Sequence, residues 1–488
     1  MVNLSGYNTL KWDVNSLIDT KQLGWKSEIR TYLGAKTWEY ERELSSCSIE
    51  DKHILALHSA VEDCKKCTSN QDIRKELDKL LNKWRDREDY KITAPTSSPV
   101  VEPPVKLIQN WKKNGHSFVS LFSGAFGLDL GFMGAGFEPL LALDKLESSE
   151  NTLAENLPTL KFIKRDIKDV TTQELLREAG LGVGELDLVT GGPPCQPFST
   201  AGRREGLLDP RASPLREFIR FVKEAQPKVF VMEEVTGLLS ARLKHVPYSR
   251  EKRDLLPEER VGSAFAKVVK MLRLTGYHLT LSNDPSLYRN SVLNAADFGA
   301  PQIRNRLIII GCKEQQPELP SPTHSKSPAL NSISEGRIQP WNTFWDATCD
   351  LQGKEMECAN LSERLAKYLN IVPPAGYWKD LPKDLIQEAM GGAYLSDGGK
   401  TGYFRRLSWD YPSPTVATSP AYRSSMLCHP EELRPISIEE YKRVQGFPDD
   451  WIVPGSISTK YLLIGNAVPV YLSYAIAKKA SEMLNNLN

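Results

Sequence analysis

The chain has 488 residues, a length that indicates two to four domains. Hydrophobic residues make up 40% of it and charged residues 25%, so most of the chain can bury a core, and wholesale disorder is excluded. Lys and Arg number 62 against 61 for Asp and Glu, a net charge of +1. This balance argues against a protein that holds nucleic acid by bulk positive charge, but it is compatible with phosphate contacts confined to one cleft.

Three sequence features bear on the location of the protein: apolar runs, the N-terminal residues and the cysteine content. It contains no run of about 18 apolar residues, so we expect no transmembrane helix and no membrane partner. Its first residues, MVNLSGYNTLKWDV, lack the charged and apolar regions of a signal peptide. The 8 cysteines are too sparse for a disulfide scaffold. We therefore expect a cytoplasmic protein with free thiols.

Residues 1–92 are expected to form a helical extension, because their apolar residues recur at three- and four-residue spacing. A linker rich in proline and serine is expected at 93–110. Cys64 and Cys67 form one Cys-x-x-Cys pair, which falls short of the four ligands of a structural zinc site, so no metal is expected. The role of this extension is open between an extra DNA contact, dimerisation and binding of a partner protein.

An alternation of short apolar runs with amphipathic segments follows, over 111–311. Helix-like segments lie at 215–225 and 263–274. The apolar runs are typical of strands buried on both faces, and they cover 118–122, 139–144, 186–192, 228–234 and 306–311. The pattern predicts an α/β domain with a parallel sheet.

The pattern changes again after residue 312. Periodicity fades and Pro, Gly and Ser become more frequent, which predicts a smaller irregular domain with its joining segment over 312–430. A helical pattern returns in 431–488, and we expect this segment to pack back on the α/β domain.

A glycine-rich turn follows the first apolar run, within FVSLFSGAFGLDLGFMGAG (118–136). Such a turn brings backbone N–H groups and a helix N-terminus close to a ligand. The next strand ends at Asp144 and a third ends near Asp166, and acids at these positions can accept hydrogen bonds from ribose hydroxyls. Together they indicate a nucleoside cofactor; the alternative is a packing turn with two surface acids.

Cys195 follows the fourth apolar run, in the loop GGPPCQPFS (191–199). The prolines at 193, 194 and 197 fix the backbone, so a rigid loop brings the thiol to the C-terminal edge of the sheet, where ligands bind in open α/β folds. A buried cysteine acting as a small hydrophobe is the usual alternative, and it fits poorly in so polar a loop.

Taken in order, these segments resemble the cytosine-C5 DNA methyltransferase family in its bacterial type II modification form. The Pro-Cys pair at 194–195 resembles the family's nucleophile, and 122–127 its cofactor loop, with Ser120 where Asp is common and Phe126 where Gly is common. VMEEV (231–235) resembles the Glu-Asn-Val motif, with Glu234 in place of Asn. QIRNR (302–306) matches Gln-x-Arg-x-Arg, and two C-terminal motifs match at 434–451 and 464–470.

This resemblance covers about 117–480 and implies a Rossmann-like, S-adenosylmethionine-dependent methyltransferase sheet with a target-recognition domain at 312–430. It implies methyl transfer to C5 of cytosine through a covalent adduct. The Cys195 thiolate would add at C6 and turn C5 into an enamine-like carbon. Glu233 would protonate or hydrogen-bond N3, and Arg304 and Arg306 would favour the thiolate. The base that removes the C5 proton is not indicated.

By motif position, the methyl donor S-adenosylmethionine would contact both ends of the catalytic domain. Phe122 would stack on the adenine, and Asp144 would accept hydrogen bonds from the ribose hydroxyls. The full set of expected cofactor contacts is Phe122, Ser123, Gly124, Gly127, Leu128, Asp144, Lys145, Asp166, Ile167, Pro194, Asn466 and Ala467.

Double-stranded DNA is the expected substrate. Because a target carbon inside a stacked duplex is out of reach, the cytosine must be flipped out, and the loop at 199–213 would close over the gap. The residues expected to contact DNA are Gln196, Ser199, Arg203, Arg204, Gln302 and Thr415. A restriction endonuclease acting on the same site would be a partner in a restriction–modification system.

Two alternative functions use the same scaffold. A tRNA cytosine-5 methyltransferase is disfavoured because those relatives usually have Cys-Phe-Thr-like residues after the proline pair and a shorter recognition region. A non-catalytic DNA-binding relative is disfavoured because Cys195, Glu233 and the 302–306 motif are all present. The recognised DNA sequence is not readable from the chain.

Overall fold

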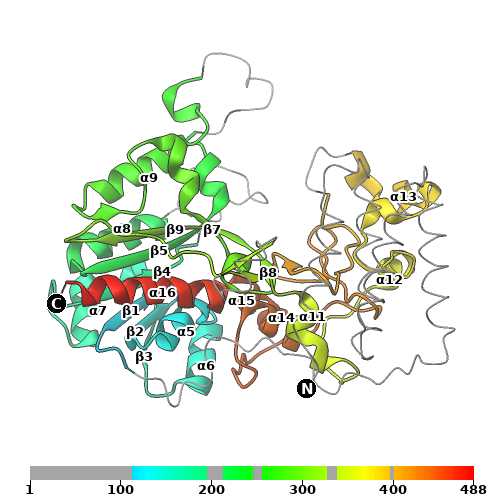
Figure 1. Ribbon diagram of the computed structural model, residues 1–488, viewed down its shortest axis with the longest axis horizontal. Helices are drawn as coiled ribbons and strands as arrows, with labels where there is room; N and C mark the ends of the chain where they lie inside the picture. The colour runs from blue at the N-terminus through cyan, green and yellow to red at the C-terminus, as the bar shows by residue number, and fades with distance from the viewer. Residues whose placement is uncertain are drawn as a thin grey trace, which may run out of the picture.

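The computed structural model describes residues 113–194, 213–244, 246, 255–326, 338–395 and 400–487. The predicted helical extension, the linker and the Cys64/Cys67 pair lie outside the described residues. The described chain forms two lobes, a larger one built around a sheet and a smaller one that carries the short helices α12 and α13 (Figure 1). None of the described helices is long and apolar enough to cross a membrane.

An eight-stranded sheet is the framework of the larger lobe. Its strands are β1 (Ser117–Leu121), β2 (Glu138–Asp144), β3 (Lys161–Lys164), β4 (Leu188–Gly191), β5 (Val229–Val235), β6 (His278–Leu279), β7 (Val292–Asn294) and β9 (Asn305–Cys312). Five of them run parallel in the order β3-β2-β1-β4-β5. The order reverses between β1 and β4, which makes the crevice at their C-terminal ends the switch point of the fold.

The predicted apolar runs all form strands, and the mixed α/β class is confirmed. The direction predicted for 306–311 is wrong, because β9 runs antiparallel to β5. An apolar run cannot show its own direction. The reason for the reversal lies in the connection: residues 295–304 link β7 to β9, and this segment is shorter than the dozen or so residues that a parallel crossover needs.

Helices cover both faces of the sheet (Figure 1). On one face lie α7 (Thr172–Ala179), α8 (Ser213–Ala225) and α9 (Ser263–Arg273), and on the other lie α5 (Gly127–Gly134) and α16 (Val470–Asn485). Helix α8 shows why: its buried residues recur at the spacing of one helix face, namely Leu215, Phe218, Ile219, Phe221, Val222 and Ala225. Helix α6 (Glu147–Asn156) connects β2 to β3.

The last helix of the chain packs tightly on the first helix of the domain. A Cβ at Gly131 would collide with the Ser473 side chain of α16, and the Ser473 hydroxyl donates to the Leu128 carbonyl. A Cβ at Gly127 would collide with the Val468 carbonyl. Two glycines therefore let α5 and α16 approach to backbone distance.

The smaller lobe has its own apolar core, which includes Leu365, Tyr368, Leu369, Met390, Phe404 and Met426. Its helices α12 (Glu363–Leu369) and α13 (Lys383–Met390) are short, and α11 (Phe344–Thr348) packs against α14 in the neighbouring core. Four described strands of two residues each lie outside the large sheet. They are β8 (Gln302–Ile303), which pairs with β12 (Ser413–Pro414), and β10 (His324–Ser325), which pairs with β11 (Gln339–Pro340). The boundaries of the predicted domains stay a prediction.

Buried Arg406 stabilises this irregular backbone. Its guanidinium donates to the carbonyls of Leu369, Val372, His429 and Glu432. One side chain thereby satisfies carbonyl oxygens that have no partner in a regular strand or helix.

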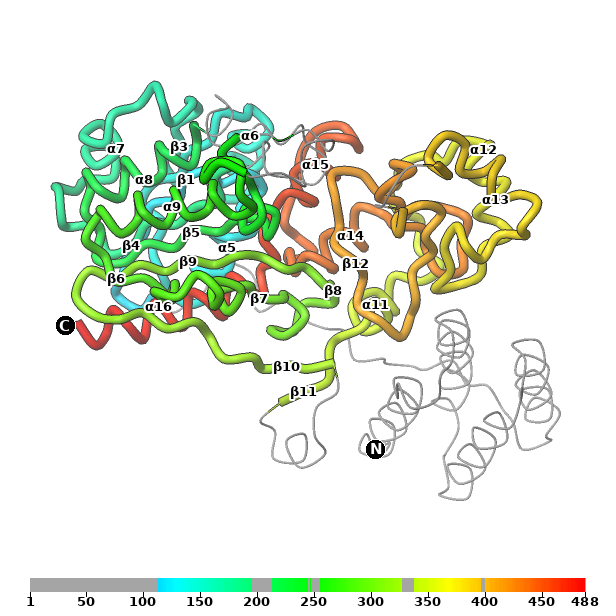
Figure 2. Tube along the Cα trace, turned by 90° about the horizontal axis from the view of Figure 1, so that it is seen from above, coloured from blue at the N-terminus to red at the C-terminus, as the bar shows by residue number. Residues whose placement is uncertain are grey.

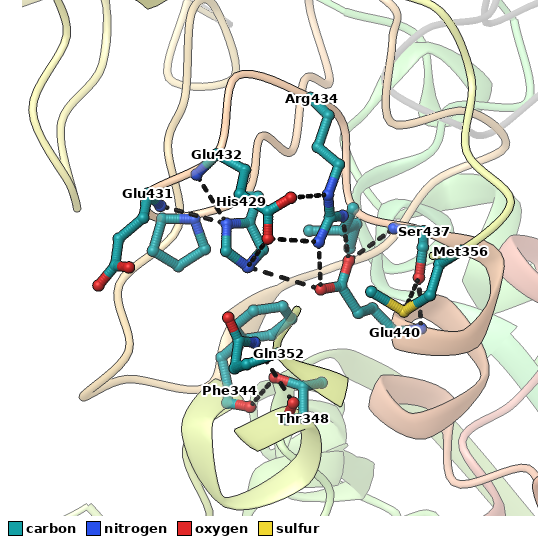
Figure 3. A network of polar contacts seen from close by, with 12 residues as sticks. Phe344, Thr348, Gln352, Met356, His429, Glu431, Glu432, Arg434, Ser437 and Glu440 are labelled. Carbon is teal, nitrogen blue, oxygen red and sulfur yellow. Dashed lines mark hydrogen bonds and ion pairs between the residues drawn. The ribbon is translucent and has the colours of Figure 1, made fainter. Parts of the chain in front are cut away.

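Helices α14 (Ile438–Gln445) and α15 (Ile457–Asn466) lie between the lobes (Figure 2). The turn that leads into α14 contains a buried polar network (Figure 3). Its centre is Glu440, fully buried, which accepts two hydrogen bonds from Arg434, at 2.7 and 3.0 Å, and one from the Ser437 backbone at 2.6 Å. His429, also buried, accepts from the backbone N–H of Glu432 at 2.9 Å.

Candidate active site

The glycine-rich loop joins β1 to α5 at the switch point. Phe122 and Phe126 both adopt left-handed backbone conformations, with φ of 62° and 69°. Phe126 thus takes a conformation that favours glycine, and its fully buried ring packs against Trp451 with centroids 6.2 Å apart, which compensates the strain. Gly124 also has a positive φ of 53°, and no atom lies within 4 Å of the position its Cβ would take.

Asp144, at the end of β2, fixes this loop. Its carboxylate accepts from the Gly124 N–H at 2.9 Å and from the Leu146 N–H at 3.0 Å. Burial raises the pKa of Asp144, and these backbone donors partly offset the shift. The side chain therefore positions the loop, and its predicted contact with a ribose stays a prediction.

The remaining predicted cofactor contacts come from two more segments. Lys145 is exposed, with its Nζ 3.7 Å from Asp166, and the buried Ile167 follows Asp166 in the chain. From the far end of the chain, Ala467 approaches the loop: a Cβ on Gly127 would lie 2.9 Å from the Ala467 Cβ. The structure thus brings Gly127 and Ala467 together from opposite ends of the domain, and the exposed Asn466 precedes Ala467 in the chain.

Glu233 and Arg306 form an ion pair across β5 and β9. Arg306 Nε lies 2.6 Å from Glu233 Oε1, and each side chain is only 13% exposed. The other oxygen, Oε2, lies against Gly192, where a Cβ would be 2.7 Å away. Gly192 begins the short segment that leads through the buried Pro193 and the exposed Pro194 towards Cys195.

The polar edge of β5 continues in Glu234, which is 2% exposed and has its carboxylate near its own backbone, with Val235 N–H donating to Oε2 at 3.3 Å. The Asn of the resembling motif is therefore replaced here by a buried acid.

Arg304 lies in a different environment from Arg306. Its buried guanidinium donates to the Val416 carbonyl at 2.8 Å and to the Gly465 carbonyl at 2.9 Å, with the Asn466 carbonyl at 3.5 Å. Burial, together with the charge of Arg306, lowers the pKa of this guanidinium. Its contacts are those of a positioning residue that ties two chain segments together, whereas its predicted part in catalysis stays a prediction.

Gln302 is fully buried, and its predicted contact with DNA stays a prediction. Its amide nitrogen donates to Gln445 Oε1 at 2.8 Å, and its oxygen accepts from the Val416 N–H at 3.0 Å. Gln445 in turn donates to the Ile464 and Ala467 carbonyls. Both polar ends of Gln302 are used inside the protein, so we assign it a positioning role.

Thr415 is exposed beside these residues, and its hydroxyl donates to the Ile303 carbonyl at 2.8 Å. We name the group Gln302, Arg304, Val416, Gln445 and Gly465 the junction, because it joins the segment after Thr415 to the end of α15. The predicted contact of Thr415 with DNA stays a prediction.

Five predicted site residues lie outside the described residues: Cys195, Gln196, Ser199, Arg203 and Arg204. Sequence reasoning also missed four residues that this geometry makes important, which are Asp129, Thr190, Gly192 and Gln445. A usable signal existed for Asp129, the one charged residue in the otherwise apolar segment GLDLGFMG. Gly192 and Gln445 lie within the motifs 191–199 and 434–451, whereas Thr190 carries no mark of its own in a single sequence.

The fold and this edge define a doubly wound α/β protein, a class in which ligands bind at the switch point of the sheet. The order of strands β3-β2-β1-β4-β5 and the glycine-rich loop after β1 are the features that carry this assignment.

Comparison with known proteins makes the assignment specific. The family model for C-5 cytosine-specific DNA methylase matches residues 116–482. The Type II methyltransferase M.PspPI of Psychrobacter sp. is 37% identical over 375 residues, which are 76% of this chain and 80% of that protein. M.Eco47II of Escherichia coli is 34% identical over 84% of this chain and 91% of its own.

Among solved structures, an E. coli prophage-encoded protein described as a DNA modification methyltransferase has a TM-score of 0.50 at 23% identity, over 76% of this chain and 100% of its own. This structural similarity supports the assignment of the fold. The chain belongs to the C-5 cytosine-specific DNA methylase family and is a DNA cytosine-5 methyltransferase.

Proposed function

We propose that this enzyme is the modification methyltransferase of a type II restriction–modification system. It methylates cytosine in a specific sequence of double-stranded DNA, which a cognate endonuclease would otherwise cut. The names of its relatives, M.PspPI and M.Eco47II among them, support the type II assignment. The observation that carries the chemistry is the Glu233–Arg306 pair beside Gly192, three residues before Cys195.

The described residues fit S-adenosylmethionine as the methyl donor. Gly124 has open space over its α-carbon, Phe122 is half-buried at the sheet edge, and Asp144 and Ala467 border the same loop. When bound, the cofactor supplies an electrophilic methyl group on a sulfonium. Phe122 would cover the adenine, Asp144 would accept from the ribose, and Asn466 with Ala467 would close the pocket.

The chain's own residues would do the rest of the chemistry. The Cys195 thiolate forms a bond to C6 of a flipped cytosine, and the electron pair of the C5–C6 bond becomes available at C5. Arg306 engages Glu233 Oε1, which leaves Oε2 to meet N3 of the base and support its protonation. Once C5 carries the methyl group, a base removes the C5 proton, the S–C6 bond breaks and the thiolate returns.

A trapping experiment tests this proposal. A duplex in which 5-fluorocytosine replaces the target cytosine cannot lose its C5 substituent as a proton, so the S–C6 bond should persist. The site is first found by bisulfite sequencing of DNA from cells that express the protein. With cofactor present, the denatured protein should migrate bound to the fluorinated duplex, and Cys195→Ser should abolish both trapping and turnover.

Two outcomes would contradict the proposal. Methyl groups that accumulate on the duplex with no trapped protein would exclude the covalent route. Methyl transfer to tRNA and none to duplex DNA would exclude DNA as the substrate. The duplex affinity should also fall steeply with salt, because phosphate contacts release counterions.

A further inference from the structure

Asp129, in the first turn of α5, is a buried carboxylate without a partner. It is 2% exposed, and neither of its carboxylate oxygens has a hydrogen-bond partner among the described residues. A buried carboxylate normally pairs with a cation or with several donors, because burial otherwise strongly disfavours the charged form. The contacts of the described residues therefore do not account for a carboxylate at this buried position.

The carboxylate cannot swing out to solvent, because α5 is fixed on two sides. Gly131 lies against Ser473 of α16, and the Ser473 hydroxyl donates to the Leu128 carbonyl next to Asp129. Gly127 lies against the Val468 carbonyl. The helix therefore keeps Asp129 directed into the interior beneath the glycine-rich loop.

The described groups that act on Asp129 are hydroxyl and backbone groups and another acid, and none of them is a cation. Ser120 of β1 lies in register with Thr190 of β4, and the Thr190 hydroxyl is buried with no partner among the described residues. The Ser120 oxygen accepts from the Ser123 hydroxyl at 2.8 Å. The charged group that acts on Asp129 is Asp144, which is also an acid.

The electrostatics agree with this geometry. Burial raises the pKa of Asp129 to about 7, and the negative charge of Asp144 adds to the shift. The Ser120 hydroxyl is near enough to lower the pKa in part, although it lies outside hydrogen-bond geometry. This cluster of oxygen atoms is thus complementary to a compact cation that donates several hydrogen bonds.

We propose that Asp129 accepts a hydrogen bond from the α-ammonium group of the methionine part of S-adenosylmethionine, with Thr190 and Ser120 as neighbouring acceptors. The inference rests on the proposed function, since it names a contact of the proposed cofactor. Of the polar groups of that molecule, the α-ammonium alone is both cationic and a donor of N–H bonds. The position of Asp129, three residues after the loop that ends at Phe126, places the contact at the same pocket.

Two ligands separate this contact from the rest of the pocket. S-adenosylhomocysteine carries the α-ammonium, whereas 5′-methylthioadenosine keeps the adenosine and thioether and lacks the amino-acid part. Their dissociation constants are measured by calorimetry on the full chain and on Asp129→Asn. Losing one charge-assisted hydrogen bond should weaken S-adenosylhomocysteine by about 10–100-fold and leave 5′-methylthioadenosine within about 3-fold.

The matched control is Asp187→Asn, at the opposite end of the sheet, where the carboxylate pairs with Lys228 and the Ser117 backbone. This variant should leave both ligands unchanged. Equal losses for both ligands in Asp129→Asn, or no loss for either, would overturn the inference. A wild-type protein that binds neither ligand would overturn the proposed cofactor, and the inference with it.

A second measurement follows the ionisation of the carboxylate. Because the ammonium needs the ionised carboxylate, S-adenosylhomocysteine affinity of the wild type should fall as the pH is lowered through about 7. Asp144 titrates in the same pocket, so Asp129→Asn serves as the reference. A pH dependence that is identical in the two proteins would overturn the assignment.

Discussion

Glu233 and Arg306 meet across the antiparallel pair β5–β9, with Arg306 Nε 2.6 Å from Glu233 Oε1. The two residues belong to motifs far apart in the chain, and the reversed direction of β9 is what brings them to the same sheet edge. If β9 ran parallel to β5, its first residues would lie beside the start of β5, and Arg306 would be far from Glu233. The direction of one strand therefore determines the chemistry of the site.

Arg306→Lys tests this pair. Lysine keeps the positive charge but loses the planar guanidinium that donates to Glu233 Oε1. We expect kcat to fall about 10–100-fold, the worth of one hydrogen bond between charged groups, with the thermal unfolding midpoint nearly unchanged. Single-turnover methylation of duplex DNA measures the rate. Arg289→Lys, at an exposed arginine, is the control, and equal rates in the two variants would contradict the role of Arg306.

Gly192→Ala tests the placement of the second carboxylate oxygen. The new Cβ would lie 2.7 Å from Glu233 Oε2, closer than such contacts allow, so Glu233 must move. We expect a loss of turnover of about tenfold or more, with the protein still folded. Gly392→Ala is the matched control, since no atom lies within 4 Å of its added methyl group. A fully active Gly192→Ala enzyme would show that Glu233 Oε2 need not stay where it is.

Gln445→Leu tests the junction. Leucine fills a similar volume but removes the hydrogen bonds that Gln445 makes with the carbonyls of Ile464 and Ala467 and with the amide of Gln302. We expect a loss of about 2–4 kcal/mol in the free energy of unfolding, because buried unpaired polar groups cost about 1–3 kcal/mol each. Chemical denaturation measures it. The exposed Gln339→Leu is the control, and a Gln445→Leu change within about 0.5 kcal/mol would contradict the prediction.

His429→Asn tests the network that leads into α14. Burial lowers the pKa of His429 to about 3, and the Arg434 charge contributes, so the folded protein keeps the ring neutral at pH values where the unfolded chain, with a pKa of about 6.5, binds a proton. Stability from this group is thus present above pH 6.5 and is lost as the pH falls towards 3.

The loss should reach at most about 1.4 kcal/mol per pH unit in the wild type. Asparagine can keep an acceptor for the Glu432 N–H but does not titrate. The free energy of unfolding of His429→Asn should therefore fall less steeply than that of the wild type as the pH is lowered. The denaturation midpoint at pH 4–6 measures this, with the exposed His278→Asn as control. Parallel acid limbs in His429→Asn and the wild type would refute it.

Sequence patterns predict the strands and the loop well, because a strand buried on both faces must be apolar throughout and because glycine marks close approaches of the backbone. Gly127 is such a case, since only a residue without Cβ fits against Val468. The mixed α/β class and the methyltransferase family follow from these features and are confirmed.

The polar interior is what the sequence does not reveal. Gln302 and Arg304 are polar residues in a motif, so surface or substrate contacts are the natural expectation, yet both are buried and bonded to backbone. Only the approach of segments distant in the chain supplies those backbone partners. The same holds for the direction of β9, which depends on the length of a connection and not on the composition of the strand.

The packing of α5 against α16 has a consequence for truncated forms of the enzyme. Gly131 lies against Ser473, which belongs to the last helix of the described chain. A chain cut before α16 should therefore lose the support of α5 and of the glycine-rich loop that precedes it.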